Sequence, residues 1–194
     1  MKISVLIPLA LTLFFAGCNK EKSEVLPAQP TPYYVKLTDA PGPYLAVNVD
    51  IQAVEVTGSG GTISLNTTPG IYNLLDFSDG TDTLIAYGAF NMQKVEQIRL
   101  ILGDQNTLVT SDSVSHPLKT PSAQQSGLKL KVNQVLEAGV AYYVLLDFDA
   151  AQSVVEQGNG NYLLKPVIRT VEQALSGAVK GKIYPPGVFA IVTL

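Results

Sequence analysis

The sequence predicts a mainly β protein, an antiparallel β-sandwich with one to three short helices. Several short segments alternate apolar and polar residues with a period of two, which is the pattern of strands with one buried face. Strong turn signals separate these segments, among them Pro41-Gly42-Pro43, the glycine-rich residues 58–61 and the Gly/Asn run at 158–161. No helical pattern is long enough for a βαβ crossover.

The first segment of the chain has the features of a targeting signal. Lys2 precedes an apolar run of about thirteen residues, from Ile3 to Phe15, and small residues stand directly before Cys18. A transmembrane anchor would need roughly 20 apolar residues, which is more than this run provides. Residues 1–17 resemble a bacterial lipoprotein signal peptide with its lipobox. The resemblance implies cleavage before Cys18, lipidation of its sulfur and anchoring in the membrane.

Residues 18–32 form the predicted tether. They contain charges, three prolines and few large apolar side chains, a composition that favours an unpacked linker. Residue 19 is Asn rather than Asp, so the inner-membrane retention signal familiar from enterobacterial lipoproteins is missing. We therefore expect an outer-membrane lipoprotein of a Gram-negative bacterium, facing either the cell surface or the periplasm.

Residues 33–175 carry the strand patterns of the sandwich. Val47, Val49 and Ile51 alternate with polar residues, after which the apolar phase shifts to Val54 and Val56, which predicts a bulge near Ala53. Further strands are expected at 98–102, 128–133 and 167–171, and residues 142–148, apolar on both faces, predict a central strand. Short helices are expected at 72–77, 83–87 and 150–157, the last capped by Asp149.

Five fragments of this body together resemble the lipoprotein domain known as domain of unknown function 4382. They are Val35–Pro41, Ile98–Leu100, the stretch from Pro121-Ser122 to Lys129, Leu146–Asp149 with Ser153-Val154, and Leu164–Ile168. The resemblance implies an Ig-like or similar sandwich in the envelope and supplies no activity. Residues 176–185 resemble the opening strand of a prealbumin-like, or transthyretin-like, module. Residues 176–194 are therefore either a strand pair of the main sandwich or the start of a truncated second module.

Several function classes are disfavoured by composition. The chain has 13 Lys and Arg against 16 Asp and Glu, so no basic excess suggests nucleic acid. His116 is the only histidine and is expected to be a solvated loop residue, because no nucleophile elbow accompanies it. With Cys18 lipidated, no other cysteine remains for redox chemistry. No cofactor is predicted.

Closely spaced carboxylates are the candidate cation ligands. Asp76, Asp79 and Asp82 flank Gly80, and such a turn would suit a hard cation such as Ca²⁺. Asp147 and Asp149 lie two residues apart, on one strand face, with Asp39 as a candidate neighbour. The alternative is that these residues make turns and caps, with Asp149 capping a helix and Asp147 pairing with Arg99 or Lys165.

Nine tyrosines and no tryptophan bear on binding. Tyr33-Tyr34 and Tyr142-Tyr143 place one ring on each face of a strand, so one ring of each pair is expected in the core. The outward rings would contact a sugar or a protein partner.

Three functions follow from these features. The first is a non-catalytic, lipid-anchored envelope protein that displays a β-sandwich for binding, adhesion or assembly with a protein or glycan partner. The second is a fimbrial-like structural subunit whose C-terminal strands, within 179–194, insert into a neighbour. The third is a carboxylate- or cation-dependent hydrolase of envelope or extracellular polymers that uses Asp147 and Asp149.

Overall fold

The computed structural model describes residues 29–121 and 126–175. The predicted signal peptide, Cys18, most of the predicted tether and the C-terminal residues 176–194 lie outside the described residues. The first strand begins at Thr31, so it includes the last two residues of the predicted tether. Within the described ranges, no helix combines the length and apolar character needed to cross a membrane.

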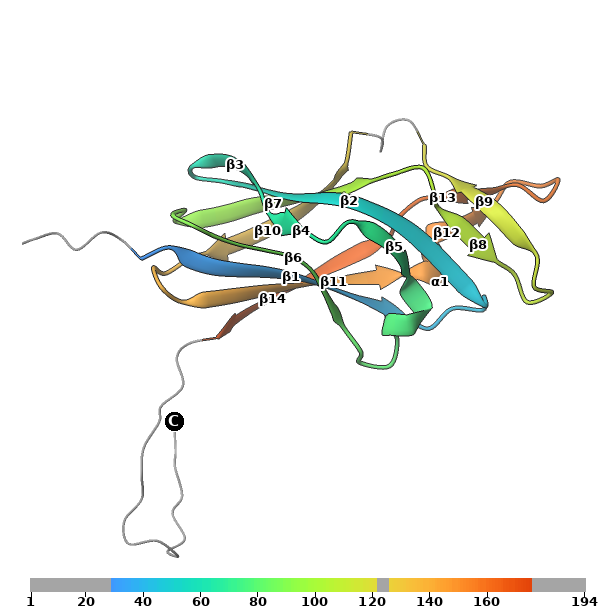
Figure 1. The fold of residues 1–194 in the computed structure, drawn as a ribbon, viewed down its shortest axis with the longest axis horizontal. Coiled ribbons are helices and arrows are strands. Elements are labelled where there is room, and N and C mark those ends of the chain that lie inside the picture. Colours follow the sequence, from blue (N-terminus) through green and yellow to red (C-terminus); the bar gives the residue numbers. More distant parts are fainter. Residues whose placement is uncertain (1–28, 122–125, 176–194) are drawn as a thin grey trace, which may run out of the picture.

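Two β-sheets pack against each other, which confirms the predicted β-sandwich; Figure 1 shows the two layers. The smaller sheet has five strands in the order β14-β11-β1-β6-β4. Their bounds are β14 (Ile168–Leu175), β11 (Ala141–Asp149), β1 (Thr31–Ala40), β6 (Thr83–Phe90) and β4 (Asn66–Thr67).

The larger sheet has nine strands, in the order β10-β7-β2-β8-β9-β13-β12, with β3 and β5 also paired to β2. Their bounds are β10 (Leu128–Val135), β7 (Lys94–Leu102), β2 (Ala46–Gly58), β8 (Thr107–Val109), β9 (Ser115–Lys119), β13 (Tyr162–Leu164), β12 (Val154–Glu156), β3 (Gly61–Ser64) and β5 (Gly70–Asn73). Strands β8, β9, β12 and β13 extend this sheet at one end of the molecule (Figure 1).

The centre of the five-stranded sheet is a parallel pair, which corrects the expectation of wholly antiparallel pairing. β1 runs parallel to β11 over eight residue pairs, from Tyr33 with Tyr142 to Ala40 with Asp149. β9 and β13 are also parallel. Parallel neighbours need a long connection, and residues 41–140, which build most of the other sheet, provide it between β1 and β11 without a crossover helix.

β2 is the central strand of the nine-stranded sheet and pairs with four other strands. It pairs with β7 and β8 along one edge and with β3 and β5 along the other. The register shifts between Ile51 and Ala53, as the change of apolar phase predicts, so Ile51 and Val54 both point into the core. The short strand β4 pairs with β6, so the chain between β3 and β5 joins the two sheets along one side.

Two short helices are present among the described residues, within the predicted number. The 3₁₀ helix η1 (Leu74–Phe77) lies inside the predicted helix 72–77, and α1 (Ala150–Ser153) begins where predicted. α1 ends early, because Val154 starts strand β12. The predicted helix at 83–87 is wrong: these residues belong to β6, which pairs with β1 and thereby satisfies its backbone.

The core lies between the sheets and is formed by the inward residues of both. Along β1 and β11, alternate side chains are buried, as a period of two requires. Fully buried large side chains come from most elements: Tyr33, Leu37, Ile51, Leu74, Ile85, Ile98, Leu100, Leu108, Leu118, Leu146, Phe148 and Leu164. Because these residues span 33–164, the body folds around one core rather than two.

Truncation of a core residue should therefore destabilise the whole body. Leu146 on β11 is fully buried, whereas Leu84 on β6 is 43% exposed. We expect Leu146→Ala to lower the free energy of unfolding by about 2–5 kcal/mol. The control Leu84→Ala should change it by less than about 0.5 kcal/mol. Urea denaturation measures both, and equal effects would contradict the assignment of the two faces.

Candidate functional site

The three carboxylates around Gly80 are each placed by a local contact or turn. The Asp76 carboxylate accepts a hydrogen bond from Nδ2 of Asn73 at 2.8 Å. Asp79 has a left-handed backbone conformation with φ of 56°, as is common for Asp in turns. The Asp82 carboxylate forms an ion pair with Lys36 Nζ at 2.8 Å. Two of these side chains are thus engaged with donors from the chain itself.

Asp147 and Asp149 also have partners within the chain. Asp147 pairs with Arg169 on β14, directly opposite in the register, and not with Arg99 or Lys165 as expected. Arg99 instead pairs with Glu55 on β2. The Asp149 carboxylate accepts a hydrogen bond from the Gln152 amide at 2.9 Å and so caps α1, as predicted.

A cation site would require several such groups to converge. Within residues 29–121 and 126–175, no three side chains of His, Cys, Asp or Glu come close enough together to hold a metal ion. Asp147 and Asp149 are occupied by an ion pair and a helix cap, so neither is presented as a free acid or base. The geometry therefore gives no particular support to Ca²⁺ binding or to hydrolysis.

Asp39 is the most perturbed carboxylate in the described part of the chain. It lies near the end of β1, is 5% exposed, and its Oδ1 accepts a hydrogen bond from the Ala150 amide at 2.9 Å. Its Oδ2 is buried without a hydrogen-bond partner. The pKa of Asp39 is raised to about 6, chiefly by burial and in smaller part by the nearby charges of Asp149 and Asp147, while the hydrogen bonds from the Ala150 and Ala40 amides oppose the shift.

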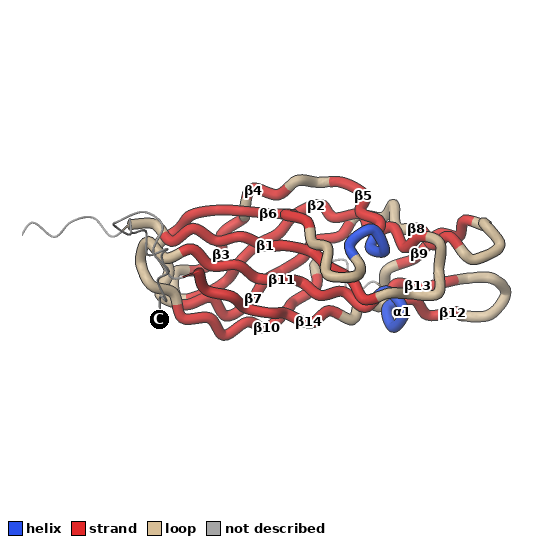
Figure 2. Tube along the Cα trace, turned by 90° about the horizontal axis from the view of Figure 1, so that it is seen from below, coloured by secondary structure: helices blue, strands red, loops and turns tan. Residues whose placement is uncertain are grey.

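Three tyrosines lie in register on the outer side of the five-stranded sheet. Tyr34 on β1 is opposite Tyr87 on β6 and opposite Tyr143 on β11. The rings of Tyr34 and Tyr143 stack with centroids 4.6 Å apart and an angle of 15° between their planes. Tyr87 is 50% exposed. We call Tyr34, Tyr87 and Tyr143 the tyrosine face; β6, β1 and β11, which carry it, run side by side in Figure 2.

Apolar and charged side chains surround the tyrosine face. The next row of the sheet places Lys36 between Leu84 and Leu145, and Leu84 is 43% exposed. The Lys36 ammonium lies over the Tyr143 ring, 5.8 Å from its centroid, and also pairs with Asp82. Asp147 on β11 and Arg169 on β14 form a second ion pair nearby. Each of these four charged side chains therefore has a partner of opposite charge within the chain.

The outer side of the nine-stranded sheet has a different character. One row across β10, β7, β2 and β3 consists of Lys129, Arg99, Glu55 and Ser64, and a second consists of Lys131, Gln97, Thr57 and Thr62. Both rows are polar, and the hydroxyls of Thr57 and Thr62 are hydrogen-bonded. These two rows carry no aromatic or large apolar side chain, and the exposed Ile71 on β5 and Val135 on β10 lie outside them. The five-stranded sheet differs in having a row of tyrosines at the centre of its outer face.

The sequence predicts part of the tyrosine face. Tyr33 and Tyr142 are buried while Tyr34 and Tyr143 point outward, as the doubled tyrosines indicate. Tyr87 is missed, because a bulge where β6 pairs with Val35 and Lys36 leaves Ile85 and Ala86 both buried and breaks the period of two.

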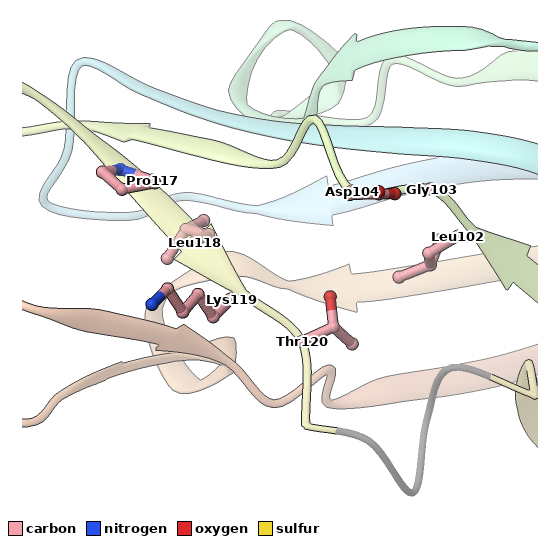
Figure 3. A pocket seen from close by; sticks show the side chains of 7 residues that line it. All are labelled: Leu102, Gly103, Asp104, Pro117, Leu118, Lys119 and Thr120. Atoms are coloured by element: carbon pink, nitrogen blue, oxygen red, sulfur yellow. The ribbon is translucent and has the colours of Figure 1, made fainter.

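An open groove of about 570 Å³ lies between the end of β7 and β9 (Figure 3). Its lining is Leu102, Gly103, Asp104, Pro117, Leu118, Lys119 and Thr120. Behind it, buried Asn106 accepts a hydrogen bond from the Asp50 amide at 2.8 Å and donates to the Gly103 carbonyl at 2.8 Å. These polar groups satisfy one another, so the network holds the loop in place rather than presenting a buried group to a ligand.

The edge strands β10 and β14 meet along the open side of the sandwich. The Thr170 hydroxyl donates to the Lys131 carbonyl at 3.3 Å, and the Asn133 amide donates to the Glu172 carboxylate at 3.1 Å. Lys129 and Lys131 are exposed on β10, and edge lysines disfavour pairing with another chain. This seam gives no particular support to strand addition.

His116 is not a loop residue as expected. It lies in β9, and its ring packs at 60° to the ring of Tyr162 on β13, with centroids 4.8 Å apart. The parallel pairing of β9 with β13 brings these two rings together. The contact is a packing interaction within the sheet extension.

The environment of Asp39 makes stability depend on pH. Because its pKa is raised in the folded state, protonated Asp39 stabilises the fold below about pH 4, and this contribution is lost as the pH rises through about 6. A shift of this size corresponds to about 3 kcal/mol. Asp39→Asn keeps the acceptor for Ala150 but cannot ionise.

The difference between the unfolding free energies of Asp39→Asn and the wild type should become more positive by about 2 kcal/mol between pH 4 and pH 7, because the wild type loses stability as Asp39 ionises. Urea denaturation at several pH values measures this difference. The exposed Asp104→Asn serves as the control for loss of a carboxylate. A difference that stays constant with pH for Asp39→Asn would contradict the description of this site.

Comparison with known proteins places the chain in a family. No curated protein and no solved structure matches the chain. The family model described as Domain of unknown function (DUF4382) matches residues 31–166, which contain β1, β11 and all three tyrosines of the tyrosine face. The chain therefore belongs to the family described as Domain of unknown function (DUF4382).

Proposed function

We propose that this protein is a non-catalytic, lipid-anchored envelope protein that binds a partner through the tyrosine face. The observation that carries the proposal is the row of Tyr34, Tyr87 and Tyr143 on the outer face of the five-stranded sheet, since the corresponding rows on the other sheet carry no aromatic side chain. Tyrosine is enriched among the residues that dominate binding at protein interfaces, because its side chain offers a large apolar area and a polar hydroxyl.

The anchor rests on the sequence. Lys2, the apolar run to Phe15 and the small residues before Cys18 support signal peptide cleavage and lipidation, and Asn19 supports sorting to the outer membrane of a Gram-negative bacterium. The tether would then connect the lipid to β1, the strand that carries Tyr34. A body held close to the membrane in this way favours encounters with other envelope components.

The lipid anchor is tested by substitution of Cys18. Cells that express the wild type should incorporate radiolabelled palmitate into the protein and retain it in the outer-membrane fraction. Cys18→Ala should abolish both labelling and retention, because no other cysteine is present. Protease treatment of intact and lysed cells then assigns the wild type to the surface or the periplasm. Labelling that persists in Cys18→Ala would contradict the anchor.

Binding through the tyrosine face is tested without the anchor. The chain from residue 18 onward, with Cys18→Ala, is sedimented with envelopes from cells that lack the protein. We expect saturable binding that Tyr87→Ser combined with Tyr143→Ser weakens by about 30-fold, the loss typical of interface hot spots. Ile71→Ser on β5, where Ile71 is 54% exposed, is the matched control and should bind normally. Equal binding by all variants would contradict the proposal.

A further inference from the structure

We infer that the partner of the tyrosine face is a protein surface with an uncharged, apolar centre. The inference rests on the proposed function and names the class of partner. Its first support is the orientation of the rings. Tyr34 and Tyr143 stack at 4.6 Å with an angle of only 15° between their planes, so each covers one face of the other. Since neighbouring strands carry the rings, this stack turns their edges away from the sheet.

A saccharide would be recognised differently. Sugar rings stack on an open aromatic face. In the pair of Tyr34 and Tyr143, one face of each ring is already covered by the other ring. Ring edges with phenolic hydroxyls suit a protein partner, which can offer apolar side chains to the ring and a backbone acceptor or donor to the hydroxyl. Tyr87, 50% exposed at the end of the row, extends the same surface.

The residues around the tyrosine face are arranged as in protein–protein interfaces, with an apolar centre and charged side chains at its edge. Leu84, 43% exposed, and Leu145 continue the apolar centre, and the charges of Lys36, Asp82, Asp147 and Arg169 lie around it. Each of these charges already has a partner of opposite sign 4 Å away or less within the chain. The partner therefore needs no net charge opposite this face, and its binding should depend little on salt.

The rings of the pair are also held in place before binding. Tyr34 and Tyr143 are fixed by their mutual stack, by the parallel register of β1 and β11, and by Lys36 over Tyr143. Side chains that are ordered beforehand lose little entropy when a partner binds, which favours affinity for another ordered surface. The two polar rows on the opposite face contain no aromatic ring that could be ordered in this way.

The test uses the sedimentation assay on three preparations from the same envelopes: proteinase-treated envelopes, periodate-oxidised envelopes, and vesicles re-formed from the extracted lipids. We expect tyrosine-dependent binding to disappear after proteinase, to survive periodate and to be absent from the lipid vesicles. Between low and high salt, affinity for untreated envelopes should change by less than about threefold. Tyr87→Phe, which keeps the ring and removes the hydroxyl, should weaken binding by about fivefold.

Other outcomes would overturn the inference. Binding that survives proteinase and is lost after periodate would identify a glycan, and binding to the lipid vesicles would identify the membrane itself. Sedimentation equilibrium of the purified chain tests whether the partner is a second copy of the same protein. Self-association that is abolished by Tyr87→Ser would show that the tyrosine face binds another copy. In the glycan and membrane cases the proposed function stands. If untreated envelopes show no tyrosine-dependent binding, the proposed function itself fails.

Discussion

The parallel pairing of β1 with β11 is the constraint on which the rest of the structure depends. It joins the beginning and the end of the body over eight residue pairs in the middle of the five-stranded sheet. Tyr33, Val35 and Leu37 from one strand and Val144, Leu146 and Phe148 from the other enter the core together. Because residues 41–140 must fold between these strands, the pair closes a long loop, and its loss would open the sandwich at its centre.

The same register sets the chemistry on both sides of the sheet. On the outer side it places Tyr34 against Tyr143, and the antiparallel pairing of β1 with β6 adds Tyr87. At the end of the pair it brings buried Asp39 to the start of α1, where the Ala150 amide partly compensates a charge that burial disfavours. The binding face and the pH-dependent carboxylate are thus two consequences of one strand pairing.

Local patterns predict local features of this protein well and long-range pairing poorly. The bulge near Ala53, the cap at Asp149 and the inward and outward tyrosines follow from period and residue type. The parallel pairing, the Asp147–Arg169 ion pair and the placement of Tyr87 depend on partners far along the chain. The sequence of segment 83–87 suggests a helix because a bulge hides its strand period, and its structure is decided by pairing with β1 and β4.

The most direct test of the central pairing is a double-mutant cycle on Tyr34 and Tyr143. The unfolding free energies of Tyr34→Ser, Tyr143→Ser and the double variant are compared with that of the wild type by urea denaturation. If the parallel register stacks these rings, the two substitutions should be coupled by about 0.5–1.5 kcal/mol. Strictly additive effects would show that the rings do not touch, and would contradict both the register and the tyrosine face built on it.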